Sequence, residues 1–205
     1  MGYFCSFGTH LEDVLRLKIA NVFSEVFSPF ILTGLLTTVI AVQTDRTPLS
    51  SVIIPLVFIA LIPQGISIYL HRSSRTTDRF IAVRKQRTPF YIATLASVLI
   101  GAVCVNFIDT SHEVKSILNL ALGTVVAVTV VNLRIKVSIH ALICAVFAVL
   151  IPFYSPMPWL FFILCLFIGA ATVWSRRALN RHSTPELVLG TVFGVLIAVL
   201  YLIIR

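Results

Sequence analysis

The sequence predicts an all-α, polytopic transmembrane helix bundle with about six to seven spans. Of its 205 residues, 58% are hydrophobic and only 12% are charged, whereas soluble domains have roughly 45–50% apolar and about 25% charged residues. The apolar residues fall into blocks of roughly 17 to 25, long enough to cross a bilayer as helices. Because lipid offers the backbone no hydrogen-bonding partner, these helices are expected to pack into one domain at 20–205, after an amino-terminal tail at 1–19.

Seven apolar blocks follow one another along the chain, with short polar connectors between them. They cover residues 20–42, 49–70, 90–109, 114–133, 137–154, 157–174 and 186–204. A turn with two prolines at 155–158 separates the fifth and sixth blocks. Residues 183–186 (Ser-Thr-Pro-Glu) have the form of a capping box that starts the seventh helix. Within that helix, Gly190 and Gly194 are most simply explained by a close contact with a neighbouring helix.

Other features argue against several classes of protein. The amino-terminal segment lacks the basic and apolar regions of a secretory signal peptide, so we expect it to be retained. Cys5, Cys104, Cys144 and Cys165 show no paired spacing, so neither a disulfide framework nor a metal site is predicted, and no cofactor is expected. The net charge of +8 favours anionic lipid headgroups over nucleic acid, because no soluble domain is available to present a binding face.

The distribution of charge predicts the orientation of the bundle. Each crossing switches sides, so seven spans place the amino terminus and the second, fourth and sixth connectors on one face. Of the 16 Lys and Arg residues, only Arg46, Lys115 and Arg205 fall on the other face, which leaves thirteen on the first. Such an excess is typical of cytoplasmic connectors. We therefore expect this basic face to be cytoplasmic, in a cell inner or plasma membrane.

Three polar clusters, at 78–89, 136–140 and 175–186, lie on the basic face. Each cluster can be explained without a functional site. Arg and Lys at span ends often anchor lipid headgroups, and Glu186 needs no role beyond that of a helix cap. Their joint arrangement favours a functional site, since two histidines, a serine and several arginines share one side, each near a helix end.

These residue types suit phosphoryl transfer. Its barrier is lowered mainly by cations and hydrogen-bond donors placed around the phosphate oxygens, and arginine matches phosphate with paired donors. A neutral imidazole can attack phosphorus to give a covalent intermediate. A second histidine can protonate the leaving oxygen.

The clusters resemble the signature motifs of the type-2 phosphatidic acid phosphatase and vanadium haloperoxidase superfamily. Residues 175–182 (Ser-Arg, five residues, His) are similar to its third signature, with Glu186 in place of the usual Asp. Residues 138–140 (Ser-Ile-His) resemble its Ser-Gly-His, and residues 87–89 (Arg-Thr-Pro) resemble its first signature, a Lys or Arg followed by Arg-Pro. The resemblance covers roughly residues 71–204.

The resemblance implies a metal-independent phosphatase with a phospho-histidine intermediate. His182 would be the nucleophile, Glu186 would orient its ring, and His140 would be the general acid for the leaving group. The phosphate would be held by Arg87, Arg176 and Ser138, with Arg79 or Arg84 as an addition from the first motif.

The sequence departs from the family pattern at several positions. Ile139 replaces the usual Gly, which hinders a close approach of the backbone to phosphate. Val137 stands where Pro is common, and Thr88 is inserted before the proline of the first motif. The family's seven-residue spacing from a basic residue to Arg87 would fall on Phe80.

The sequence therefore predicts a membrane-embedded phosphatase acting on a lipid phosphate or diphosphate, with the headgroup at the cytoplasmic surface and the tail in the bilayer. Phosphatidic acid, phosphatidylglycerol phosphate and polyprenyl phosphates would all suit the same polar cluster. Two alternatives stay open: a lipid phosphoryl or phosphatidyl transferase, and a non-enzymatic transporter or lipid-binding scaffold whose arginines anchor headgroups. Whether the chain forms a homo-oligomer is also left open.

Overall fold

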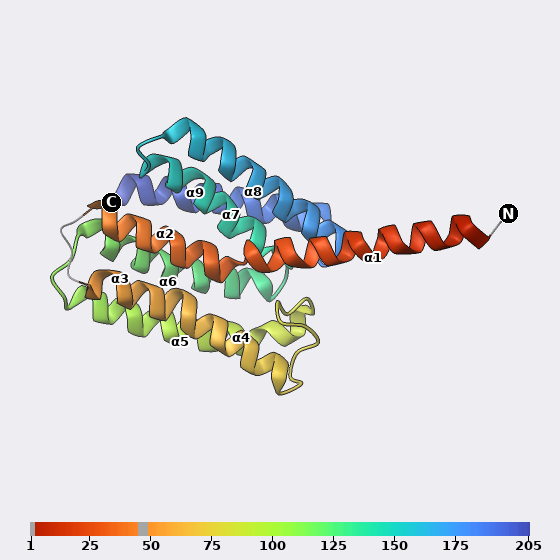
Figure 1. The fold of residues 1–205 in the computed structure, drawn as a ribbon. Helices are drawn as coiled ribbons and strands as arrows, with labels where there is room; N and C mark the ends of the chain where they lie inside the picture. Colours follow the sequence, from red (N-terminus) through yellow and green to blue (C-terminus); the bar gives the residue numbers. More distant parts are fainter. Residues whose placement is uncertain (1–2, 45–48) are drawn as a thin grey trace.

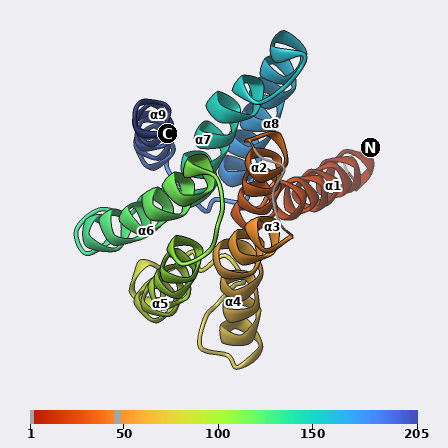
Figure 2. The same cartoon turned by 90° about the vertical axis from the view of Figure 1, so that its left-hand side faces the viewer.

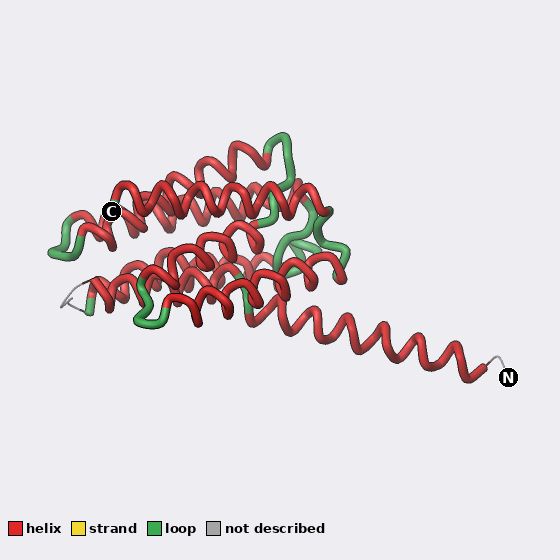
Figure 3. The backbone as a smooth tube through the Cα atoms, turned by 90° about the horizontal axis from the view of Figure 1, so that it is seen from above, coloured by secondary structure: helices red, strands yellow, loops and turns green. Residues whose placement is uncertain are grey.

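The chain forms a single bundle of long helices whose loops gather at two opposite ends (Figures 1 and 3). The computed structural model describes the backbone of residues 3–44 and 49–205, with side chains from residue 12 onward, and no strand occurs within those ranges. The all-α class predicted from the sequence is confirmed. Cys104, Cys144 and Cys165 are free, while the side chain of Cys5 and all of Arg46 lie outside the described part.

Within the described ranges, six helical segments are long and apolar enough to cross a membrane, so the chain is a multi-pass membrane protein. They are Glu12–Thr44, Ser50–Arg72, Arg84–Asn106, His112–Asn132, Pro158–Ala178 and Thr184–Ile204. A seventh apolar helix, Ile139–Phe153, is shorter. Together these segments run through the bundle in alternating directions, in agreement with the seven apolar blocks of the sequence (Figure 1).

The first crossing is broken in two, at a point the apolar block did not indicate. Helix α1 (Tyr3–Val26) ends just before Ser28, and α2 (Pro29–Thr44) begins directly after it. Proline disfavours helical geometry in the residue before it and is readily accepted at the first helical position, which explains the break. The segment expected to be a tail is helical from Tyr3, and α1 projects beyond the other helices (Figure 1).

The second crossing contains a π-helical turn. It consists of α3 (Ser50–Pro55), η1 (Leu56–Leu61) and α4 (Ile62–Arg72). Pro55 cannot donate a backbone hydrogen bond, so the regular pattern is interrupted there. The side chain of Ser97 donates to the carbonyl oxygen of Phe58 over 2.8 Å, which satisfies one backbone group of the irregular turn.

Among the later elements, α6, α7 and α9 begin at capping side chains. These elements are η2 (Arg84–Gln86), α5 (Arg87–Asn106), α6 (His112–Asn132), α7 (Ile139–Phe153), α8 (Pro158–Ala178) and α9 (Thr184–Ile204). The side chains of Ser111 and Ser138 accept backbone hydrogen bonds at the starts of α6 and α7. The predicted capping box of Ser183 and Glu186 at the start of α9 is confirmed.

Helix α7 lies at the centre of the bundle and packs most extensively against α9 and α8. The close contact predicted for the two glycines of α9 is confirmed. A Cβ atom at Gly190 would lie 2.5 Å from the carbonyl oxygen of Ser138, and one at Gly194 would lie 2.2 Å from that of Leu142. The backbones of α7 and α9 therefore touch, which fixes the start of α7 beside the start of α9.

Candidate active site

The three polar clusters of the sequence meet at one end of the bundle. The backbone N–H of Ser138 donates to the carbonyl oxygen of Glu186 over 3.2 Å, which joins the second cluster to the third. The guanidinium of Arg87 donates to the carbonyl oxygen of Val137 over 3.1 Å, which joins the first cluster to the second. The site is thus assembled from the starts of α5, α7 and α9, the end of α8 and the connector after α4.

A small cavity of about 60 Å³ opens between these elements, and we call it the polar cavity. It has room for a group larger than a single water molecule. Its polar lining consists of Ser67, Arg79, Arg87, Tyr91, His140, Arg176 and His182. Five of the residues proposed from the sequence therefore share one cavity.

His182 lies in the loop between α8 and α9 and is only 5% exposed. Its Nδ1 lies 2.7 Å from Oε2 of Glu186, so the carboxylate fixes the tautomer in which Nδ1 carries the proton. Nε2 is then the basic nitrogen. Burial, and next the positive charge of Arg176, lower the pKa of His182 to about 3, so the ring is neutral at pH 7.

Glu186 combines two roles that the sequence presented as alternatives. The same Oε2 atom accepts from the backbone N–H of Ser183 over 3.3 Å, which is half of the capping box, and contacts the ring of His182. Nζ of Lys136 lies 3.4 Å from this oxygen and also donates to the carbonyl oxygen of Arg181 over 2.7 Å. Lys136 therefore helps to hold the carboxylate in place, a role that sequence reasoning missed.

Arg176 is completely buried near the end of α8. Its Nη1 donates to the hydroxyl of Ser24 in α1 over 2.8 Å, whereas Nε and Nη2 have no hydrogen-bonding partner among the described residues. Unsatisfied donors on a buried cation are costly, and an anion in the polar cavity is the ligand that would satisfy them. Ser24 was not predicted, because it comes from a distant apolar helix in which nothing local distinguishes it.

His140 occupies the first turn of α7 and is 4% exposed. Its ring meets that of Phe80 edge to face, with 4.8 Å between the ring centroids. Its Nε2 has no hydrogen-bonding partner among the described residues. This nitrogen is therefore available to exchange a proton with a bound group.

Phe80 lies among three guanidinium groups, which sequence reasoning did not anticipate. The central carbons of Arg79, Arg176 and Arg181 lie 5.6, 5.7 and 5.9 Å from the centre of its ring. Cations are attracted to an aromatic face at such distances, so the ring keeps the like charges in place. One feature of the sequence marked this position: the seven-residue spacing of the first family motif, from a basic residue to Arg87, falls on Phe80.

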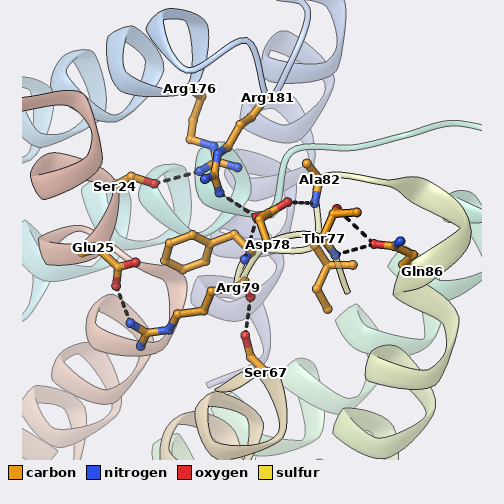
Figure 4. A network of polar contacts seen from close by, with 12 residues as sticks. Ser24, Glu25, Ser67, Thr77, Asp78, Arg79, Ala82, Gln86, Arg176 and Arg181 are labelled. Carbon is orange, nitrogen blue, oxygen red and sulfur yellow. Dashed lines mark hydrogen bonds and ion pairs between the residues drawn. The ribbon is translucent and has the colours of Figure 1, made fainter. Parts of the chain in front are cut away.

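Asp78 holds the connector that carries Phe80 (Figure 4). Its carboxylate accepts from the backbone N–H groups of Phe80 and Ala82 over 2.9 and 2.8 Å. It also pairs with Arg181 over 2.7 Å. The connector after α4 is thus joined to the loop that carries His182, and Asp78 is a structural residue that was not singled out from the sequence.

Arg87 lines the polar cavity and is only 4% exposed, but part of its guanidinium serves the fold. Its Nε donates to the carbonyl oxygen of Ile81 over 2.8 Å. Ile81 has a φ of 48°, which a β-branched residue rarely adopts.

Ser138 does not line the cavity, and its buried hydroxyl accepts from the backbone N–H of Ala141 at the start of α7. In the structure, Ser138 is therefore the N-cap residue of α7.

The structure separates the two additional arginines proposed from the first motif. Arg79 lines the polar cavity and pairs with Glu25 of α1 over 2.6 Å. Arg84 is exposed, does not line the cavity and donates to the carbonyl oxygen of Arg134 over 2.6 Å. Only Arg79 is placed where it could contact a ligand in the cavity.

The arrangement can bind an anion and supply a nucleophile and a proton donor to it. Within the described ranges, no group of three or more His, Cys, Asp or Glu side chains is arranged to hold a metal ion. No protein-family model, no curated protein and no solved structure matches this chain.

Proposed function

We propose that the chain is a lipid phosphate phosphatase that works through a phospho-histidine intermediate and without a metal ion. The observation that supports it best is the buried guanidinium of Arg176, which has two nitrogens without partners among the described residues and which lines a cavity together with His182 and His140. A phosphate group would satisfy the donors of Arg176 and gain further positive charge from Arg79 and Arg87.

In the first step, Nε2 of His182 attacks the phosphorus atom with its lone pair. The bond from phosphorus to the alkoxy or phosphate leaving oxygen breaks, and that oxygen takes a proton from His140, which enters the cycle as an imidazolium favoured by the negative charge of the bound phosphate. The carboxylate of Glu186 stabilises the positive charge that develops on the imidazole of His182, because it accepts the Nδ1 hydrogen bond. The guanidinium groups stabilise the negative charge on the phosphate oxygens.

In the second step, a water molecule attacks the phosphorus atom of the phospho-histidine. His140, now neutral, accepts a proton from this water, and the bond between phosphorus and Nε2 breaks. Inorganic phosphate leaves and His182 regains its lone pair. Both histidines return to their starting state, so the cycle needs no other reactant.

The membrane setting supports a lipid substrate, because the polar cavity lies at the end of a bundle of apolar spans. The end that carries the cavity is the basic one, so we propose that it faces the cytoplasm in a cell inner or plasma membrane. A phosphatidic acid, a phosphatidylglycerol phosphate or a polyprenyl phosphate or diphosphate would place its phosphate there with its tail in the bilayer.

Phosphate release by purified protein from a panel of these lipids tests the proposal. His182→Ala should reduce release by roughly 10⁴-fold or more, since it removes the nucleophile, and acid-labile phosphate should be trapped on wild-type protein only. His71→Ala is the matched control, because His71 is exposed and does not line the polar cavity. Release by His182→Ala at the wild-type rate would refute the mechanism.

The alternatives give different results in the same assay. A transferase would pass labelled phosphate to an added alcohol in preference to water. A transporter or lipid-binding scaffold would release no phosphate from any lipid of the panel, and the paired replacement of His140 and His182 would leave lipid binding unchanged.

A further inference from the structure

A second cavity, of about 140 Å³, lies inside the bundle beside the polar cavity, and we call it the apolar chamber. Its wall combines side chains from α2, η1, α4, α5, α6, α7 and α9. The two cavities share five lining residues, Pro29, Phe30, Phe90, Tyr91 and Ile139. They are therefore adjoining compartments, one polar and one apolar, that meet at these residues.

The chamber is apolar even where its wall contains threonine. Thr33, Thr37 and Thr124 each donate their hydroxyl to a backbone carbonyl of their own helix. Their polar groups are thus satisfied. Among the threonines of the wall, Thr94 alone has a buried hydroxyl without a partner in the described part of the chain. Along α7 the chamber extends from Ile139 to Val146, about 10 Å at the helical rise of 1.5 Å per residue. These features fit a hydrocarbon chain.

One side of the chamber is poorly closed. Helix α6 packs against α5, α2 and α9, but its contact with α7 is marginal at most. Figure 2 shows α6 splayed outward from α7 and α9. Thr124 and Val128 of α6 and Leu142 and Val146 of α7 all line the chamber. A chain in the bilayer could enter between these two helices without leaving an apolar environment.

We infer that the apolar chamber holds a hydrocarbon chain of the substrate, which enters from the bilayer between α6 and α7 while its phosphate occupies the polar cavity. This inference rests on the proposed phosphatase function and specifies how the lipid lies in the site. The occupant is one chain of the lipid phosphate, because the chamber continues directly from the cavity that would hold the phosphate.

The chamber positions the substrate more than it attracts it. A lipid chain is surrounded by hydrocarbon both in the bilayer and in the chamber, so moving it gains little hydrophobic free energy. A chain held at a fixed depth, however, fixes the distance of the phosphate from His182. Small misplacements of a reacting group lower rates strongly, so a blocked chamber should reduce turnover of long-chain substrates.

The test compares two neighbouring valines of α6. Val125 lines the chamber, whereas Val126 is 45% exposed on the outer surface of the helix and does not line it. Butyl, octyl and hexadecyl phosphate are offered to wild-type protein, Val125→Trp and Val126→Trp. For Val125→Trp we expect kcat/KM for hexadecyl phosphate to fall by about tenfold or more while that for butyl phosphate is kept. Val126→Trp should behave as the wild type.

Equal chain-length dependence in Val125→Trp and the wild type would overturn the inference, as would an equal loss in both variants. A second measurement does not need turnover: hexadecyl phosphate with a photoreactive diazirine on its chain is cross-linked to the protein. We expect labels on chamber-facing residues of α6 and α7, lost in Val125→Trp. Labels confined to outward-facing residues such as Val126 would refute the chamber as the site of the chain. Failure of the phosphatase proposal is distinct, because wild-type protein would then release no phosphate from any of the three compounds.

Discussion

The guanidinium of Arg176 is held by a single side-chain hydrogen bond, to Ser24, and is fully enclosed by protein. A buried cation with unpaired donors destabilises a fold, and apolar replacements of similar length are often neutral or stabilising. The arrangement makes sense if an anion completes it during function. Binding and stability therefore place opposite demands on this residue.

Arg176→Met should separate these two demands. We expect a melting temperature in detergent that equals or exceeds that of the wild type, because the unpaired donors are gone. Phosphate release should fall by roughly 10²–10³-fold, which is typical when an enzyme loses one hydrogen-bond donor to an oxygen that gains negative charge in the transition state. Arg177→Met, at the exposed neighbouring position, should change neither quantity. A marked drop in melting temperature for Arg176→Met would contradict the prediction.

The depressed pKa of His182 makes stability depend on pH. The ring binds a proton near pH 6.5 when unfolded but only near pH 3 when folded, so the unfolded state holds more protons between these values. Stability must then decline as the pH falls from about 6.5 toward 3. Melting temperatures measured from pH 8 to pH 4 should fall more steeply for the wild type than for His182→Gln. An identical slope in both would show that His182 is not buried in its neutral form.

At the scale of helices, the contact of α7 with α9 determines the geometry of the site, because α7 carries His140 and α9 carries Glu186. Gly194→Leu should push the two helices apart, since even a Cβ atom would lie 2.2 Å from the carbonyl oxygen of Leu142. We expect a lower melting temperature and loss of phosphate release together. Gly123→Ala in α6 is the control, because no atom lies within 4 Å of a Cβ there. Wild-type behaviour of Gly194→Leu would show that the contact is not needed.

The positions of most helices could be predicted, because an apolar run long enough to cross a bilayer has few alternative structures. The break before Pro29 could not be located from hydropathy, since both sides of it are apolar. Helix α1 extends to Tyr3 through the charged residues Glu12 and Asp13, where hydropathy carries no helical signal. The π-helical turn after Pro55 lies inside one continuous apolar run, so hydropathy could not locate it either.

The candidate site was predictable to the extent that its residues belong to short motifs. His182, His140, Arg176 and Arg87 share the polar cavity, as expected for the three clusters. Ser138 and Arg84 lie elsewhere, because a motif specifies residue types and not the directions of side chains. The partners Ser24, Phe80, Asp78 and Lys136 come from contacts between distant segments, which no single stretch of sequence records.

At the scale of the whole molecule, the proposed orientation of the bundle in the membrane rests on the distribution of charge alone. A variant without its native cysteines carries a single new cysteine at Gln86→Cys, on the cavity end, or at Tyr154→Cys, on the opposite end. A membrane-impermeant thiol reagent added to intact cells should label position 154 and spare position 86. Labelling of position 86 from outside would reverse the orientation and place the polar cavity on the external face.

The burial of His140 at the start of α7 has a consequence for the supply of water. The 15 residues of α7 span about 22 Å, against about 31 Å for the 21 residues of α8, and His140 in its first turn is 4% exposed. In the proposed mechanism, hydrolysis needs one water molecule per cycle, and that molecule would have to reach the buried polar cavity. The access of water would then set the competition between water and any alcohol for the phospho-histidine. Lengthening the lifetime of that intermediate by restricting water would turn a hydrolase into a transferase without altering a single reacting group.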